Sequence, residues 1–100
     1  MLPEKYTTFR EFYPFYLSQH QNSACRLLHF IGTSIIIVLL IFYVNTAKDL
    51  LLIPFVGYGF AWIGHFFFEK NKPATFKYPI YSLMGDFLMF WHILLQKEKI

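Results

Sequence analysis

Charge and cysteine are both scarce in this chain of 100 residues. Only 15% of the residues are charged, and two stretches, 27–47 and 50–68, hold no Asp, Glu, Lys or Arg. The single cysteine, Cys25, excludes an internal disulfide, so the fold needs no oxidising compartment, and a small buried hydrophobe is its expected role. The chain also lacks a dense basic stripe, which argues against nucleic-acid binding. No internal repeat is visible, so we expect one domain, residues 1–100.

Apolar side chains are correspondingly abundant. Hydrophobic residues are 56% of the chain and aromatic residues 22%. Each uncharged stretch has about the 20 residues that a helix needs to cross a hydrocarbon core of roughly 30 Å. The first stretch is not a signal peptide, because a long polar and aromatic segment precedes it and no small-residue cleavage site follows. We therefore expect an all-α, integral membrane bundle; a soluble bundle would need other chains to cover it.

Four helices are expected within this bundle. A capping-box pattern at Thr8 begins an interfacial helix over about 8–18, which Pro14 would interrupt or kink. Two spans over about 27–46 and 50–68 form a hairpin, because the turn between them is short. A last helix over about 79–96 carries Asp86 at its centre, so it either crosses with that carboxylate facing inward or lies partly in the interface. Crossing is the preferred interpretation.

Basic residues set the expected orientation. Lys5, Arg10 and Arg26 precede the first span, and three lysines lie in segment 69–77 after the second. The positive-inside bias then places the N-terminus and segment 69–77 in the cytosol. A bacterial inner membrane and an endoplasmic reticulum membrane would impose the same pattern, and a homo-oligomer is compatible with it.

Histidines at matched depth mark the candidate site. His29 in the first span and His65 in the second lie toward the same cytosolic end of the antiparallel hairpin. Glu69 follows His65 by four residues, so the two share a helix face. Ionisable side chains at membrane depth usually face a bundle interior or a cavity. These residues are therefore functional candidates, whereas His92 on the last helix is more typical of a packed residue.

The position of His20 remains open. On one continuous helix His20 would lie opposite His29, because nine residues correspond to two and a half turns. A Ser18-x-x-Gln21 capping pattern favours a helix that includes His20, while Asn22 as a helix cap favours a bend. Only the bend would bring His20 to the other two imidazoles.

Three classes of function are open to such a cluster. Three imidazoles with a nearby carboxylate suit a first-row metal, and open positions on it would suit iron and dioxygen. A haem protein would use His29 and His65 as axial ligands on facing helices. A small membrane scaffold or transporter would use the histidines as a proton relay or leave them to satisfy one another.

Two motifs resemble a known family. The segment Tyr16-Leu-Ser-Gln-His20-Gln-Asn22, followed by Arg26-Leu-Leu-His29, and the motif Gly64-His65-x-x-x-Glu69-Lys70-x-x-Pro73-Ala74 are similar to those of the fungal 2-hydroxy-palmitic acid dioxygenases and their short bacterial relatives. The second motif is the more specific of the two. The resemblance extends from about residue 9 to residue 91.

The resemblance implies an integral membrane enzyme that uses non-haem Fe²⁺ and dioxygen to shorten 2-hydroxy fatty acids by one carbon, a step of fatty-acid α-oxidation. His20, His29 and His65 would hold the iron. Glu69 would be a further ligand or would orient His65. A 2-hydroxy acid can chelate iron through its carboxylate and hydroxyl, and Arg26 or Lys70 would hold that carboxylate at the membrane interface. The bilayer, the fatty acid and dioxygen are the implied partners.

Overall fold

The computed structural model describes residues 6–72 and 77–100, and within these residues every regular element is helical. The all-α expectation is confirmed. A short 3₁₀-helix, η1, precedes α3, and a π-helix, η2, continues from it. The elements in chain order are α1 Phe9–Ser18, α2 Ser23–Phe42, η1 Asp49–Leu51, α3 Leu52–Ile63, η2 Gly64–Glu69 and α4 Pro79–Leu94.

Helix α1 begins at its expected cap and runs on through Pro14. The Thr8 hydroxyl accepts a hydrogen bond from the Glu11 amide at 3.2 Å, as the capping-box pattern predicts. The expected interruption at Pro14 does not occur, because α1 remains one helix to Ser18. Phe12 and Tyr16 on its inner face are buried against Met89 of α4. This aromatic packing holds the helix across the missing proline N–H.

Helices α2 and α3 form the expected hairpin, but α2 begins earlier than residue 27. The Asn22 side chain accepts hydrogen bonds from the amides of Ala24 (2.8 Å) and Cys25 (3.3 Å), and so fixes the start of the helix. At the far end, the Asp49 carboxylate accepts from the amides of Asn45 (3.0 Å) and Thr46 (3.2 Å). These bonds stabilise the tight turn, so α2 ends at Phe42, four residues before the expected boundary.

Two helical stretches in the described part of the chain are long and apolar enough to cross a membrane. They are Ser23–Phe42, with 20 residues and a mean hydropathy of 2.2, and Asp49–Glu69, with 21 residues and a mean hydropathy of 1.6. Helix α4 is not one of them, because it ends at Leu94 after 16 residues. It is thus shorter than the roughly 20 residues that a span needs, so its length does not support the preferred crossing.

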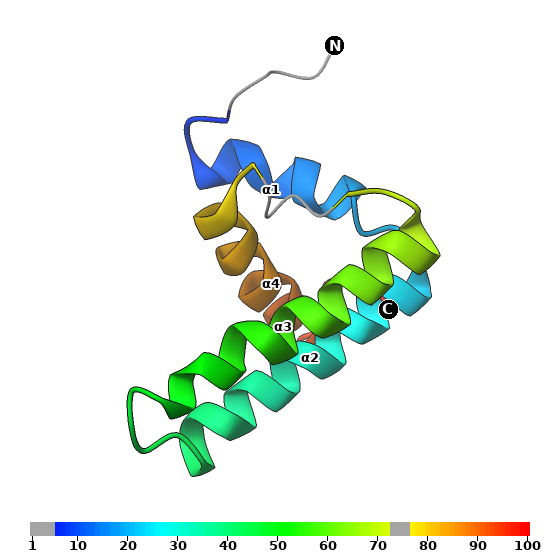
Figure 1. The fold of residues 1–100 in the computed structure, drawn as a ribbon. Coiled ribbons are helices and arrows are strands. Elements are labelled where there is room, and N and C mark those ends of the chain that lie inside the picture. The colour runs from blue at the N-terminus through cyan, green and yellow to red at the C-terminus, as the bar shows by residue number, and fades with distance from the viewer. Residues whose placement is uncertain (1–5, 73–76) are drawn as a thin grey trace.

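The other elements gather at one end of the hairpin. Figure 1 shows α1 lying across the end where α2 begins and η2 ends, and α4 meeting the hairpin at an angle near its middle. The opposite end, which carries the turn, projects away from the rest of the molecule. Large apolar side chains are bare along this projecting arm: Phe42 and Phe55 are each 80% exposed. The fold therefore has a packed end and an unpacked arm.

Candidate metal centre

Four buried side chains converge at the packed end: His20, Cys25, His29 and His65. One potential ligand atom from each lies within 4.8 Å of those of the other three. His20 is 1% exposed and His65 is 2% exposed. Because the three histidines come from the α1–α2 connection, α2 and η2, the tertiary fold and not local sequence assembles the group. Of the histidines, it contains the three that the sequence singled out.

His20 reaches the cluster because the chain bends. Helix α1 ends at Ser18 and α2 begins at Ser23, so the bend capped by Asn22 is the alternative that the structure adopts. The His20 ring stacks on the Tyr16 ring, with centroids 4.0 Å apart, and its edge faces His29 and His65. Burial, reinforced by the two neighbouring imidazoles, holds the pKa of His20 well below its usual value. The ring therefore stays neutral, the form that can bind a metal.

The second ring nitrogen of each imidazole identifies the tautomer. His20 Nδ1 lies 2.6 Å from the Tyr16 carbonyl oxygen, and His29 Nδ1 lies 2.8 Å from that of Cys25. A carbonyl oxygen can only accept a hydrogen bond, so Nδ1 must carry the proton in both rings. The Nε2 atoms of His20 and His29 are then unprotonated, with their lone pairs directed toward each other.

His65 shows the same arrangement with a side-chain acceptor. Its Nδ1 lies 2.7 Å from Asn71 Oδ1. The amide of Asn71 is oriented without ambiguity, because its Nδ2 donates to the backbone oxygen and to the side-chain oxygen of Gln19, each at 3.1 Å. Oδ1 therefore faces the imidazole and accepts its Nδ1 proton. A neutral imidazole that donates its outer N–H to an oxygen is the usual form of a metal-ligating histidine.

These tautomers leave a contact that needs a cation. The Nε2 atoms of His20 and His29 are 3.1 Å apart, and two neutral rings with their protons on Nδ1 have no proton to place between them. Two facing lone pairs at that distance repel unless a positive charge lies beside them. The His65 ring completes the group, with its centroid 4.4 Å from that of His20 and 5.0 Å from that of His29. The donor set therefore fits a first-row metal ion.

The same geometry disfavours haem. Two axial histidines bind opposite faces of a flat macrocycle, which must lie between them. Here a third imidazole, His20, contacts both His29 and His65, and the three rings meet at interplanar angles of 77–87°. A macrocycle cannot pass between rings that converge in this way.

Cys25 belongs to the cluster, although the sequence predicted only a packing role. Its Sγ lies 3.6 Å from His29 Nδ1. The spacing of Cys25 and His29 by four residues was the available signal, since it places both on one face of a helix. Gly64 permits the approach of the two helices: a Cβ there would lie 3.0 Å from Cys25 Sγ and 3.2 Å from Cys25 Cα.

The π-helix η2 positions His65. At its end, the backbone N–H groups of Lys70 and Asn71 both donate hydrogen bonds to the His65 carbonyl oxygen. The bond from Asn71 is 3.0 Å long. Lys70 takes a left-handed φ of 62° and ends the helix. This reversal brings Asn71 back to the imidazole. π-helical turns occur frequently at functional sites, and no sequence pattern used above predicts one.

The structure gives Glu69 a contact that the sequence did not predict. Its carboxylate accepts a hydrogen bond from the Asn22 amide at 2.5 Å and is not one of the clustered donors. The acceptor that orients His65 is Asn71 instead. The reason is local: the π-turn separates residues 65 and 69 from the α-helical phase on which the expectation rested. Glu69 thus connects η2 to the bend that carries His20.

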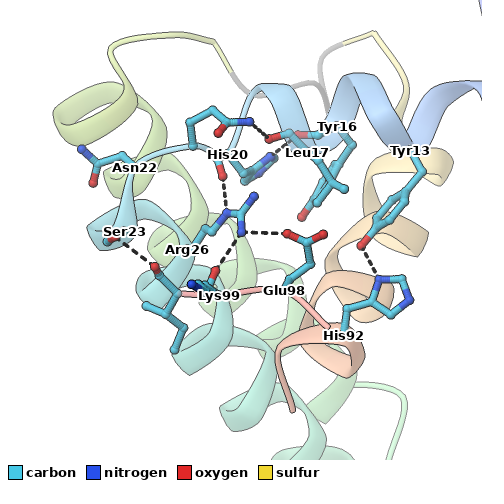
Figure 2. A network of polar contacts seen from close by, with 12 residues as sticks. Tyr13, Tyr16, Leu17, His20, Asn22, Ser23, Arg26, His92, Glu98 and Lys99 are labelled. Atoms are coloured by element: carbon cyan, nitrogen blue, oxygen red, sulfur yellow. Dashed lines mark hydrogen bonds and ion pairs between the residues drawn. The ribbon is translucent and has the colours of Figure 1, made fainter. Parts of the chain in front are cut away.

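Arg26 is tied into a network around His20 (Figure 2). Its Nε donates to the His20 carbonyl oxygen, and its Nη1 donates to Glu98 Oε1 at 3.0 Å and to the Lys99 carbonyl at 2.7 Å. The guanidinium therefore fastens the C-terminal residues over the bend. Lys70, the other expected cation, is exposed. Pro73 of the second motif lies outside the described residues.

His92 stays apart from the cluster. Its Nδ1 lies 3.0 Å from the Tyr13 hydroxyl (Figure 2). Burial and the nearby Glu98 raise the pKa of Tyr13 to about 12, so the hydroxyl stays protonated. This contact packs His92 against α1, away from the other three histidines.

These features define a small all-helical protein with a buried centre of three imidazoles and one thiol. Comparison with known families agrees with that description. The chain belongs to the family of 2-hydroxy-palmitic acid dioxygenase Mpo1-like proteins, whose model matches residues 6–98 and thus covers both motifs. No curated protein and no solved structure matches the chain.

Proposed function

We propose that the protein is a membrane-embedded, non-haem iron dioxygenase that shortens 2-hydroxy fatty acids by one carbon. The observation that carries the proposal is the convergence of three buried imidazoles, each of which has its Nδ1 bonded to an oxygen. The family name supplies the substrate class and the type of reaction. The two helical stretches that are long and apolar enough to cross a membrane support a location in the bilayer.

His20, His29 and His65 would hold Fe²⁺, which would supply a place where dioxygen and the 2-hydroxy acid meet. Three protein ligands leave positions for both reactants. Cys25 is the nearest further donor. The chain's own contribution is to fix the three rings through Tyr16, Cys25 and Asn71, and to keep bulk water out of a centre that is almost fully buried.

Glu69 and Arg26 act on this centre through His20 in our proposal. Glu69 bonds the backbone at Asn22, and Arg26 bonds the backbone of His20 itself, so both hold the bend in place. Lys70 is exposed beside η2 and is the cation that we propose for attracting the substrate carboxylate. The positive-inside bias would place this end of the hairpin at the cytosolic face.

The test is turnover by the purified protein. The protein is loaded with Fe²⁺ without oxygen, given 2-hydroxypalmitate and then exposed to air. We expect mass spectrometry to detect a product one carbon shorter that depends on both iron and the 2-hydroxyl group. Unsubstituted palmitate is the matched control substrate, and His92→Ala is the control variant. Equal activity with and without iron, or no one-carbon-shorter product from a fully loaded protein, would overturn the proposal.

A further inference from the structure

A small cavity lies directly against the histidine cluster. It has a volume of about 20 Å³, enough for about one water molecule, and its lining includes His29, Thr33 and Asp86. Asp86 accepts a hydrogen bond from the Tyr16 hydroxyl, whose ring stacks on His20. The cavity therefore has polar groups at its end near the imidazoles.

A larger apolar groove continues from this cavity. The groove has a volume of about 260 Å³, just below the lower end of the roughly 300–1,000 Å³ of small-molecule sites. Cavity and groove share four lining residues: Ile36, Gly57, Leu83 and Asp86. Beyond them the groove is lined by Ile53, Pro54, Tyr58, Pro79 and Ile80, which are mainly apolar. The two spaces thus form one path that begins polar and becomes apolar.

Helix α4 and Gly57 keep this path open. Figure 1 shows that α4 meets the hairpin at an angle, so the two elements diverge toward the start of α4, where Pro79 and Ile80 line the groove. At Gly57, a Cβ would lie 3.0 Å from the Cδ1 of Ile36, so any side chain there would enter the shared part of the path. The junction between cavity and groove is consequently narrow and controlled by one small residue.

We propose that this groove is the acyl-chain site of the enzyme, with the 2-hydroxy acid head at the end of the groove that adjoins the cavity beside His29, and the tail extending past Gly57 toward Ile53 and Pro79. The proposal rests on the proposed function for the identity of the head group. A single-chain amphiphile matches a path that is polar at the imidazoles and apolar at its far end. The groove is lined by residues of α2 and α3, which belong to the two stretches apolar enough to span a membrane, and by the start of α4, so a fatty acid can enter sideways from lipid.

The first experiment locates the tail without requiring turnover. The full chain, in nanodiscs without added metal, is irradiated with 2-hydroxypalmitate that carries a diazirine at its terminal carbon. We expect labelled peptides to contain Ile53, Pro54, Pro79 or Ile80, and excess unlabelled 2-hydroxypalmitate to suppress the labelling. The exposed depression lined by Phe55, Val56 and Gly59 on the same hairpin serves as the lipid-facing reference. Labelling no stronger in the groove than there would overturn the proposal.

The second experiment compares two glycines on α3. Gly57→Leu would fill the junction, whereas Gly59→Leu is the matched control because a Cβ at Gly59 meets nothing within 4 Å. We expect Gly57→Leu to lower groove labelling by about tenfold or more and Gly59→Leu to leave it unchanged. In iron-loaded protein the same variant should lose palmitoyl-length substrates and retain 2-hydroxy acids too short to pass residue 57.

The two proposals fail separately. Suppressible labelling of the groove supports the acyl site even if no product forms, and in that case only the reaction is wrong. One-carbon shortening by wild-type protein with no groove labelling, or equal effects of Gly57→Leu and Gly59→Leu on labelling, overturns the acyl site and leaves the reaction in place.

Discussion

The two ends of the α2–α3 hairpin belong to the same helices but differ in which side chains they bury. At the packed end, His29 and Thr33 of α2 are each 5% exposed, because α3, η2 and α4 pack against this helix. On the projecting arm, Val38 and Ile41 of the same helix are 53% and 66% exposed. Polar side chains are thus buried in protein, and apolar side chains are bare.

The arm and the packed end therefore suit different surroundings. In water the bare arm would be unfavourable by about 25 cal/mol for each Å² of apolar surface, whereas lipid removes that cost. The packed end needs protein partners because each of its polar atoms must find a hydrogen bond once water is excluded. We therefore expect substitutions at the packed end to change metal binding, and substitutions on the arm to change membrane insertion.

The largest effect is expected from His65→Ala. This variant removes one of three proposed ligands and leaves the facing Nε2 atoms of His20 and His29 without the third donor. Metal content after gentle purification with iron should fall to background, while His92→Ala, which alters a histidine outside the cluster, should keep wild-type content. Full occupancy in His65→Ala would show that the packed end is not a metal centre.

Val38→Lys tests the arm. A lysine near the middle of a span lowers insertion by about 3 kcal/mol on the translocon scale, so a measured membrane-insertion efficiency should drop sharply. Metal affinity in detergent should stay within about twofold of wild type, because the residue lies far from the polar contacts at the packed end. Val38→Leu is the conservative control. Unchanged insertion with Val38→Lys would contradict a lipid-facing arm.

Asn71→Ala removes the acceptor that orients His65 but leaves the ligands in place. Loss of such an orienting partner lowers metal affinity by about 10–100-fold. Competition with a chelating dye measures the change, and Asn71→Asp should restore affinity because it keeps an oxygen toward Nδ1. An affinity equal to wild type in Asn71→Ala would mean that the tautomer of His65 is not set by this contact.

Gly64→Ala separates close packing from ligand chemistry. The new Cβ would meet the backbone of Cys25 at 3.2 Å, which cannot move as a flexible side chain can. We expect a loss of about 1–3 kcal/mol in the free energy of unfolding, measured in detergent. Gly59→Ala, in open space, should cost nothing. Equal stability of the two variants would contradict the close approach of α2 and η2.

Glu98→Gln should have the smallest effect. Glu98 is the more exposed partner of the ion pair with Arg26, at 30% against 11%, and a partly exposed pair contributes about 1 kcal/mol. The contacts of Arg26 with the carbonyls of His20 and Lys99 remain. Metal affinity should therefore change less than twofold. A tenfold loss would show that the charge of Glu98, and not the backbone contacts, holds the bend over the site.

Much of the fold follows from the sequence, because apolar helices of membrane-spanning length can be predicted from the length and composition of uncharged stretches. The two uncharged stretches predict α2 and the η1–α3–η2 helix, and Asn22 is a candidate cap for α2 by residue type. The boundaries of α2 depend on individual hydrogen bonds to the side chains of Asn22 and Asp49. A hydropathy pattern contains no information about these bonds. The bend at His20 was likewise undecidable, since two capping patterns overlap there.

The sequence predicts which histidines form the site, but not the contacts of the residues around them. Matched depth brought His29 and His65 together, and the family resemblance added His20. The role of Asn71, the displacement of Glu69 and the position of Cys25 all depend on the π-turn and on close approach at Gly64. These are consequences of tertiary packing, so helical phase alone could not reveal them.

X-ray absorption spectroscopy of the Fe²⁺-loaded protein tests the central claim most directly. The account predicts one iron per chain with multiple-scattering features of three imidazoles at about 2.0–2.2 Å, close to the distances of comparable metal–nitrogen bonds. Iron bound by oxygen ligands alone, or with fewer than three imidazoles, would contradict it.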